Sequence, residues 1–250
     1  MTAVAIAGAG GRMGTASAAA IVAAPDLDLV GCFDPGHPGD DVGGLEVSAD
    51  PAVFDGADVV LEWAPVDAVL ARLPLHAAGA RHVVVGSSGF TAERLAAAEE
   101  AWEGAGSRLL VVPNFAIGAV LMQRFAAEAA RWFDASEVIE LHHDAKADAP
   151  SGTSLATAVG MRGEQRRRTE SVEIVEGARG ADVDGVRVHS VRLPGLLAHQ
   201  EVLLGNPGEV LTIRHDSMDR SSFMPGILLA LRNVATLTDP VTVGLDALLH

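Results

Sequence analysis

The stretch VAIAGAGGRMG, residues 4–14, joins an apolar run of strand length to a loop that contains four glycines. Gly8, Gly11 and Gly14 follow the run with the spacing G-x-x-G-x-x-G, and Met13 stands where the strict G-x-G-x-x-G pattern has its third glycine. Glycines at such a turn let the backbone approach a pyrophosphate, and the N-terminus of the following helix offers free N–H groups. A purely structural turn is the alternative, but the pattern favours dinucleotide binding.

An acidic residue after the next apolar run supports this interpretation. Asp34 follows the run at residues 27–33 and stands 20 residues beyond the last glycine of the loop, where a carboxylate can bind the adenosine ribose hydroxyls. Pro35 and Gly36 come next, with no arginine there to receive a 2′-phosphate. The local pattern therefore indicates that NADH is accepted, whereas Arg12 in the loop keeps NADPH open.

Apolar runs of strand length alternate with helical patterns through the first half of the chain. Parallel strands buried on both faces are continuously apolar, whereas helices show a period of 3.6 residues. The alternation predicts an α/β fold with a Rossmann-type doubly wound parallel sheet. The predicted strands are residues 3–7, 27–33, 58–63, 82–85 and 109–112, and the predicted helices are residues 16–24, 66–78 and 92–102.

The pattern changes after residue 114. Beyond a long helix and a strand, short β-rich segments are separated by glycine and proline turns, with no helix between them. This predicts a smaller α+β domain over residues 114–219 with a mostly antiparallel sheet. A last helix and strand return to the first domain, which would comprise residues 1–113 and 220–250. The elements expected after residue 114 are helices at 117–132 and 223–237 and strands at 137–142, 171–176, 186–193, 199–204, 210–215 and 241–245.

Composition narrows the function classes. The 250 residues carry a formal net charge of -15, and the one basic cluster, Arg166 to Arg168, is interpreted as a solvated helix end or loop. The sequence therefore predicts no nucleic-acid or membrane-surface partner. Cys32 is the single cysteine, the first residues lack a signal-peptide pattern, and no apolar run could span a bilayer. These features predict a cytoplasmic location.

The stretch ELHHDAKADAPSGTS, residues 140–154, contains Lys146, the only lysine of the chain. Arginine serves on most surfaces, but not where a compact, rotatable ammonium must reach a ligand. Ser151 or Thr153 can cap the apolar helical run that follows, and the free N–H groups of that helix form a second anion site. Two anion-binding devices in one loop predict a carboxylate-bearing or phosphorylated substrate. The alternative for Lys146 is an ordinary surface lysine.

Two adjacent histidines precede this lysine. His142 and His143 stand at the end of a predicted strand, so their side chains should point to opposite faces. An isolated histidine is more often structural, but beside Lys146 and a capped helix we expect His142 to face the ligand. Adjacent histidines without cysteines lack zinc-ligand spacing, so no metal site is predicted.

Five ordered segments together resemble the dihydrodipicolinate reductase family, also called 4-hydroxy-tetrahydrodipicolinate reductase, over nearly the whole chain. They are GAGGRMG (8–14), VVGSSGFT (84–91), PNFAIGAV (113–120), ELHHDAKADAPSGT (140–153) and HSVRLPGLLAHQEV (189–202). The resemblance implies a dinucleotide-binding domain built from both chain ends, a central substrate and tetramerisation domain, a homotetramer, and a place in the diaminopimelate route to lysine.

The chemistry that the resemblance implies is hydride transfer from NADH or NADPH to the unsaturated ring of a cyclic dicarboxylate formed by loss of water, followed by protonation of the resulting enamine. His142 would be the general acid, and Lys146 would bind a ring carboxylate and assist the proton. The implied carboxylate-binding residues are His143, Lys146, Ser151, Gly152 and Thr153. The implied cofactor-binding residues are Gly8, Gly11, Arg12, Met13, Gly14, Asp34, Gly86, Ser87, Ser88, Asn114 and Phe115.

The chain departs from the family pattern after the third predicted strand. Glu62, Trp63 and Ala64 stand where the family usually has aspartate, phenylalanine and a hydroxyl residue. Two other functions therefore stay open: a paralogous reductase for another small carboxylated substrate, and a nucleotide-sensing or scaffold protein without turnover. The sensor hypothesis predicts damage at catalytic positions, whereas His142 and Lys146 are both present.

Overall fold

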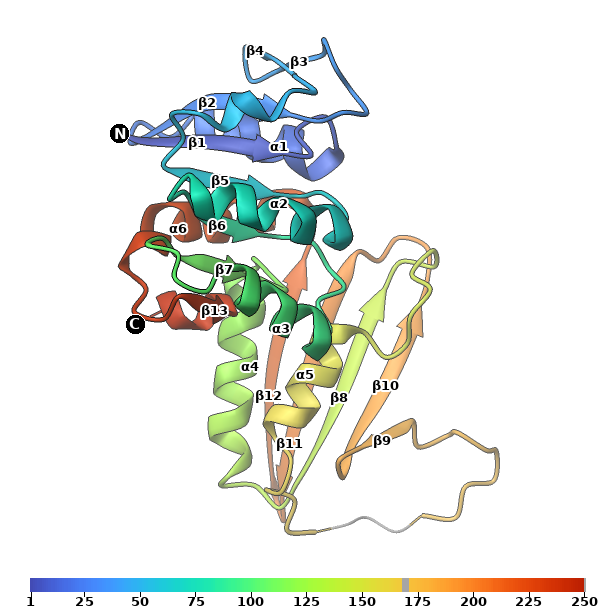
Figure 1. Cartoon of the computed structure of the whole chain (residues 1–250). Helices are drawn as coiled ribbons and strands as arrows, with labels where there is room; N and C mark the ends of the chain where they lie inside the picture. Colours follow the sequence, from blue (N-terminus) through green and yellow to red (C-terminus); the bar gives the residue numbers. More distant parts are fainter. Residues whose placement is uncertain (168–170, 250) are drawn as a thin grey trace. The chain divides into compact units, whose positions relative to one another are not determined.

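The computed structural model describes residues 1–167 and 171–249, and the chain divides into two compact units (Figure 1). The first unit combines both ends of the chain, Met1–Ile117 and Arg220–His250, and the second is Gly118–Asp219. Arg168, the last arginine of the basic cluster, lies outside the described residues. In the described part of the chain, no helix has the length and hydrophobicity that a membrane span requires.

The first unit contains a six-stranded sheet in the order β13-β7-β6-β5-β1-β2, and every pairing in it is parallel. Helices α2 and α3 pack together on one face, and α1 and α6 pack together on the other (Figure 1). The predicted doubly wound fold is therefore confirmed. The strands are β1 (Thr2–Ala7), β2 (Leu27–Phe33), β5 (Val59–Glu62), β6 (His82–Val85), β7 (Leu109–Val111) and β13 (Val241–Val243).

The helices of this unit follow the predicted pattern, except that one starts earlier and the helix predicted at 223–237 ends at Asn233, before a 3₁₀ turn. Helix α1 begins at Arg12 rather than at residue 16, because Gly11 already takes the N-cap position. The last strand, β13, pairs with β7, so the chain returns to the first sheet as predicted. The remaining elements are α1 (Arg12–Val22), α2 (Val66–Ala78), α3 (Ala92–Ala101), α6 (Met224–Asn233), the short ladder β3 (Asp41–Val42) and β4 (Leu45–Glu46), and the 3₁₀ helices η1 (Pro51–Phe54), η2 (Arg220–Phe223), η3 (Val234–Thr236) and η4 (Leu245–Leu248).

The second unit contains a five-stranded sheet in the order β12-β11-β8-β10-β9, packed on one face by α4 and α5 (Figure 1). The sheet is mostly antiparallel, as predicted, except that β10 runs parallel to β8. That parallel pair is made possible by α5 and the long connection after it. The elements are α4 (Ile117–Ala130), β8 (Ala135–His142), α5 (Gly152–Gly160), β9 (Ala181–Val183), β10 (Val186–Arg192), β11 (Ala198–Asn206) and β12 (Glu209–Ser217).

The strand predicted at residues 171–176 is wrong. This segment has no strand pairing, and Val172 and Ile174 are 94% and 96% exposed. The edge of β10 is instead occupied by β9, through a tight hairpin whose turn residues Asp184 and Gly185 have φ of 51° and 91°. Two consecutive residues with positive φ are typical of a type I′ turn, which matches the twist of paired strands. Apolar alternation alone therefore misplaced this strand.

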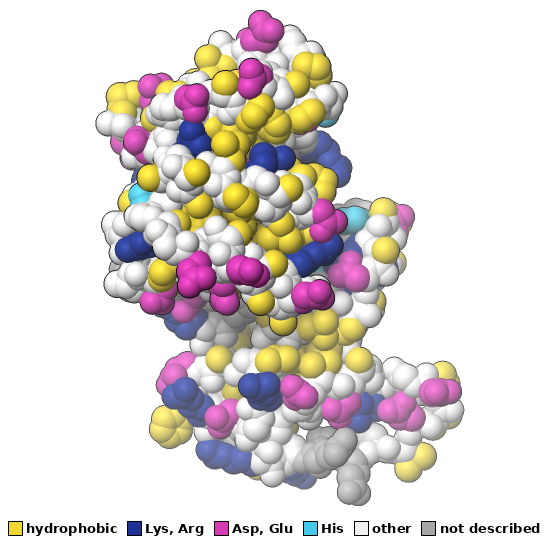
Figure 2. Space-filling model, in the orientation of Figure 1, with side chains coloured by type: hydrophobic (Ala, Val, Ile, Leu, Met, Phe, Trp, Pro, Cys, Tyr) yellow, Lys and Arg dark blue, Asp and Glu magenta, His cyan; other side chains and the backbone are white. Residues whose placement is uncertain are grey.

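Charge is spread over the surface. In the view of Figure 2, acidic side chains occur over both units and are interspersed with arginines, and no basic patch gathers on this face. With a net charge of -15, the protein as a whole repels anions. An anionic ligand must be bound by a local arrangement of donors.

Candidate functional site

The glycine loop forms a tight turn between β1 and α1. Gly8 has a φ of +77°, and a Cβ added to Gly14 would lie 2.2 Å from the carbonyl oxygen of Gly8. Gly11 caps α1 without a side-chain hydrogen bond, so no side chain occupies the N–H groups of the first turn. These glycines keep backbone donors close to any group that lies on the loop. The loop therefore fits a pyrophosphate, which needs such donors at a helix N-terminus.

A hollow of about 340 Å³ lies beside this loop. It is formed at the carboxyl ends of β1, β5 and β6, where the strand order reverses direction and open α/β sheets bind their ligands. Eight of the cofactor residues expected from the sequence are brought together here, and Trp63 is added to them. The lining residues are Gly8, Gly11, Arg12, Met13, Gly14, Trp63, Gly86, Ser87 and Ser88.

Asp34 lies at the end of β2 and holds the loop in place. Its carboxylate accepts hydrogen bonds from the N–H groups of Gly10 at 3.1 Å and Gly36 at 2.9 Å, and His37 Nδ1 lies 3.1 Å from it. Asp34 does not line the hollow itself. An ionised carboxylate has about four acceptor positions, so ribose hydroxyls could still bind to it.

Asn114 and Phe115 lie after β7, in the same unit. Asn114 Oδ1 accepts a hydrogen bond from the N–H of Ala116 at 2.9 Å, which shapes the turn into α4. Phe115 is buried, and its ring centroid lies 5.5 Å from that of Trp63. Neither residue lines the hollow, so Phe115 reaches it only through Trp63.

Trp63 is the lining residue that the sequence did not assign to the cofactor. Its indole Nε1 donates a hydrogen bond to Ser17 Oγ at 3.1 Å, and a Cβ on Gly86 would lie only 2.1 Å from the ring. The indole therefore packs directly on the backbone of Gly86, which itself lines the hollow. Ser87 adds a link, because its hydroxyl donates to the carbonyl of Ala64.

Glu62, just before Trp63, is fully buried and ionically paired. Arg72 donates to its carboxylate through Nε at 2.9 Å and Nη2 at 2.7 Å, and His76 Nε2 lies 3.0 Å away. Burial alone would raise the pKa of Glu62, but the hydrogen bonds from His76 and Arg72 outweigh it and lower the pKa below its ordinary value. Glu62, which departs from the family pattern, is thus part of a structural ion cluster that fixes the end of β5.

Replacing Trp63 with phenylalanine is expected to weaken NADH binding about five-fold, which corresponds to the roughly 1 kcal/mol of one lost side-chain hydrogen bond. The smaller ring loses Ser17 as a partner and leaves space beside Gly86. Titration calorimetry measures this change. Trp132→Phe is the matched control, because Trp132 is 70% exposed, and it should bind NADH normally. Unchanged affinity in Trp63→Phe would show that the indole does not support the hollow.

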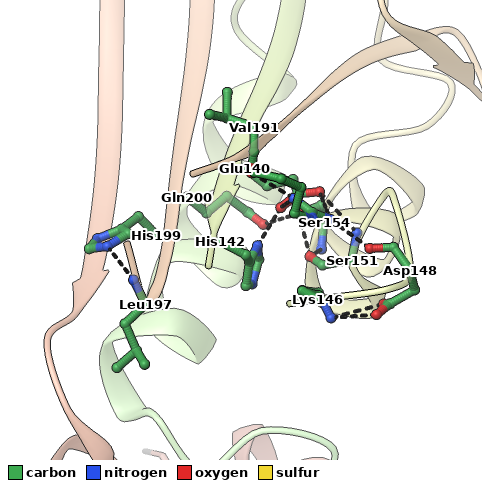
Figure 3. A network of polar contacts seen from close by, with 11 residues as sticks. Glu140, His142, Lys146, Asp148, Ser151, Ser154, Val191, Leu197, His199 and Gln200 are labelled. Carbon is green, nitrogen blue, oxygen red and sulfur yellow. Dashed lines mark hydrogen bonds and ion pairs between the residues drawn. The ribbon is translucent and has the colours of Figure 1, made fainter. Parts of the chain in front are cut away.

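The histidine and lysine motif lies in the second unit, at the end of β8. His142 is the last residue of the strand, and its ring Nδ1 contacts the carboxylate of Glu140 (Figure 3). His143 follows the strand, where its N–H bonds the carbonyl of Leu197 at 3.4 Å. Its side chain makes no contact with Glu140. The strand ends between the two histidines, so only His142 keeps the orientation that strand alternation sets.

Lys146 lies on the loop after β8 and is paired. Its Nζ donates to both carboxylate oxygens of Asp148, at 2.8 and 2.9 Å (Figure 3). This hydrogen bond lowers the pKa of Asp148 below its ordinary value. The Asp148 side chain is 62% exposed, so the pair is accessible from solvent. A ligand carboxylate that binds Lys146 must therefore share or displace Asp148.

Helix α5 begins directly after this loop. Ser151 is its N-cap, with Oγ accepting from the N–H of Ser154 at 3.2 Å, so the predicted cap is confirmed at the first of its two candidate positions. Gly152 begins the helix, and a Cβ added to it would meet no atom within 4 Å. Thr153, in the same first turn, accepts a bond from Gln123 through its carbonyl at 3.1 Å. The helix start is thus open around Gly152.

A buried polar chain supports this helix start. Ser151 Oγ lies 2.8 Å from Ser154 Oγ, which donates to Gln200 Oε1 at 2.8 Å (Figure 3). Gln200 Nε2 in turn donates to Thr157 at 2.7 Å. Gln200 comes from β11, far along the chain. Its position inside a β-rich stretch gave no signal for this role.

In the described residues, no group of three or more His, Cys, Asp or Glu side chains is arranged to hold a metal ion.

Comparisons with known proteins cover both units. The family model described as dihydrodipicolinate reductase, N-terminus, matches residues 2–115, and that described as dihydrodipicolinate reductase, C-terminus, matches residues 118–249. The 4-hydroxy-tetrahydrodipicolinate reductases of Nocardia farcinica and Corynebacterium diphtheriae are 49% and 45% identical, over 98% and 97% of this chain and 98% and 96% of theirs. The dipicolinate-bound dihydrodipicolinate reductase from Paenisporosarcina sp. TG-14 is 36% identical, with a TM-score of 0.85 over 98% of both chains.

Proposed function

This chain belongs to the dihydrodipicolinate reductase family, and from that premise we propose that its glycine loop binds the dinucleotide while the loop after β8 binds the ring that is reduced. The activity is NAD(P)H-dependent reduction of 4-hydroxy-tetrahydrodipicolinate to tetrahydrodipicolinate, in diaminopimelate and lysine biosynthesis. The observation that carries this function is the 49% identity over 98% of the chain to a reductase of that name.

The first unit offers the cofactor its glycine loop. The first-turn N–H groups of α1 would hold the pyrophosphate, and Asp34 would accept hydrogen bonds from the adenosine ribose hydroxyls. Gly86, Ser87 and Ser88 would lie by the nicotinamide, which supplies a hydride when bound. Arg12 in the hollow and His37 beside Asp34 are the two groups that could bind a 2′-phosphate, so both NADH and NADPH belong in the proposal.

The second unit offers two anion-binding devices for a cyclic dicarboxylate. The ammonium of Lys146 would bind one carboxylate, taking it in place of Asp148. The first-turn N–H groups of α5 would bind the other, together with Ser151, Gly152, Thr153 and His143. The open space around Gly152 leaves room for that approach. The dipicolinate bound to the relative from Paenisporosarcina supports this substrate class.

His142 would complete the reaction as a general acid. Loss of the 4-hydroxyl as water first gives the unsaturated ring. Reduction then adds a hydride to that ring and leaves an enamine, which must gain one proton at carbon to give the product. His142 Nε2 is the proposed proton donor, and Lys146 would stabilise the negative charge of the substrate during the transfer. Hydride and proton together account for both hydrogen atoms that the ring gains.

We also propose a homotetramer in the cytoplasm. Strand β12 is at the edge of the second sheet, and Val210 and Leu211 on it are 69% and 38% exposed. An exposed edge strand with apolar side chains is a surface that proteins usually cover. Light scattering after size exclusion would give the mass of a tetramer if the sheets associate.

The activity is tested by supplying freshly generated 4-hydroxy-tetrahydrodipicolinate, made from pyruvate and aspartate semialdehyde by its synthase, and following NADH and NADPH absorbance in separate reactions. Rapid oxidation of at least one cofactor is expected. Failure with both, despite demonstrable dinucleotide binding, would favour a paralogous reductase with another carboxylated substrate. Trp63 and Ala64 would then be the first residues to revert to the family pattern.

A further inference from the structure

Glu140 is a fully buried carboxylate on the strand that carries His142. Residues two apart on a strand share a face, and Ser136, Val138 and Glu140 form the buried side of β8. His142 is the next residue on that side. On this face of the strand, the proposed general acid is therefore the neighbour of a buried acidic side chain, in a sheet core that is otherwise apolar or neutral.

Donors from several elements bond this carboxylate, and Figure 3 shows Glu140 with two of them, His142 and Ser151. Arg192 donates through Nη1 at 2.9 Å and Nη2 at 2.8 Å, the N–H of Ser151 donates at 3.3 Å, and His142 Nδ1 also contacts the carboxylate. Arg192 is the parallel partner of His142 on β10, and its Nη2 also donates to the carbonyl of Asp148 at 2.6 Å. Glu140 thus connects the histidine, the helix cap and the loop that bears Lys146.

The contact fixes which nitrogen of His142 carries its hydrogen. An ionised carboxylate is an acceptor only, so Nδ1 must be protonated to bond it. Burial would raise the pKa of Glu140, but the hydrogen bonds from Arg192, Ser190 and His142 lower it below its ordinary value, which keeps the acceptor ionised. His142 Nε2 makes no hydrogen bond to any described residue. Nε2 is therefore the nitrogen that gains and loses the exchangeable proton.

The charges around His142 come from three elements. Burial lowers its pKa, Glu140 raises it, and Lys146 and Arg192 lower it. At the start of α5, the neutral hydroxyls of Ser151 and Ser154 bond each other, and Ala198 of β11 stands opposite His142. In the next residue of β11, His199, both ring nitrogens already have partners: Nδ1 lies 2.7 Å from Asp216, and Nε2 accepts from the N–H of Leu197. Glu140 is thus the group that counteracts the two cations.

We propose that Glu140 is a positioning residue for the proposed reaction: held by Arg192, it fixes His142 as the Nδ1–H tautomer and leaves Nε2 as the proton-donating atom. This inference rests on the proposed function. Arg192 contributes by keeping the carboxylate ionised and by joining it to the loop of Lys146. A carboxylate that orients a catalytic histidine acts in this way in other enzymes.

Glu140→Gln keeps the shape of the side chain and removes its charge. We expect kcat to fall about 10–100-fold, with a much smaller change in the KM of the ring substrate, because positioning acts on the proton transfer. The basic limb of the pH profile should move to lower pH, because the group that raises the pKa of His142 is lost. Glu137→Gln is the matched control: Glu137 is on β8 and bonds His189 and Arg179, but on the other face. Its profile should be that of the unmodified chain.

A direct readout needs no turnover and no change at Glu140. Nitrogen NMR of ¹⁵N-histidine in the intact chain, assigned with His142→Gln, should show Nδ1 of His142 protonated and Nε2 titrating. The Nε2–H tautomer in the unmodified chain would overturn the inference even if Glu140→Gln fails to fold. An unshifted pH profile in a folded Glu140→Gln variant would reduce Glu140 to a structural role. Absence of NADH or NADPH oxidation by the unmodified chain would instead count against the proposed function and leave the NMR result standing.

Discussion

Lys146→Ala is expected to lower kcat/KM for the ring substrate by about 10²–10³-fold, the usual loss when one charged stabilising group is removed. The methyl group cannot bind a substrate carboxylate, and Asp148 loses its cation and remains as a repelling charge. NADH affinity, measured by calorimetry, should stay within about two-fold, because the glycine loop belongs to the other unit. A comparable loss of NADH affinity would contradict separate cofactor and substrate sites.

Lys146→Arg tests why the chain keeps a single lysine. The guanidinium is planar and larger than an ammonium, so it should bind Asp148 as a rigid fork and fail to turn toward the ligand. We expect most of the loss seen with alanine. Full activity of Lys146→Arg would contradict the functional reading of this lysine and favour an ordinary surface position.

His142→Gln is expected to lower kcat by about 10²–10⁴-fold, the contribution typical of general acid catalysis. The pH profile gives the mechanism a second check. A general acid works in its protonated form, and burial holds the pKa of His142 below the ordinary 6.5. The kcat of the unmodified chain should therefore rise as pH falls through that range, and this limb should be missing from His142→Gln. A variant that keeps the limb would assign the proton to another group.

The first unit was largely predictable because its strands are buried on both faces. Such strands leave uninterrupted apolar runs, and β2 and β6 have the bounds that the sequence predicted. The glycine loop was equally predictable, because the position of Gly14 has no room for a side chain and therefore requires glycine. In the second unit apolar alternation did not reveal burial, so residues 171–176 were misplaced and the parallel pairing of β10 was missed.

The ion clusters were beyond sequence reasoning. Arg192 reaches Glu140 from a position 52 residues away, and no local pattern pairs them. Glu62 follows the same arrangement, because an arginine binds its carboxylate through two nitrogens and a histidine completes the set. Each buried carboxylate stands at or near the carboxyl end of a strand. Spatial pairing therefore explains why a strand with an acidic residue can still be buried.

The most direct test of the reaction supplies fresh 4-hydroxy-tetrahydrodipicolinate together with NADH or NADPH that carries deuterium at the transferable position. Mass spectrometry then determines where the label goes. We expect tetrahydrodipicolinate with one deuterium on a ring carbon, in an amount equal to the cofactor oxidised. Oxidised cofactor with unlabelled product, or no product with either cofactor, would contradict hydride transfer by this chain.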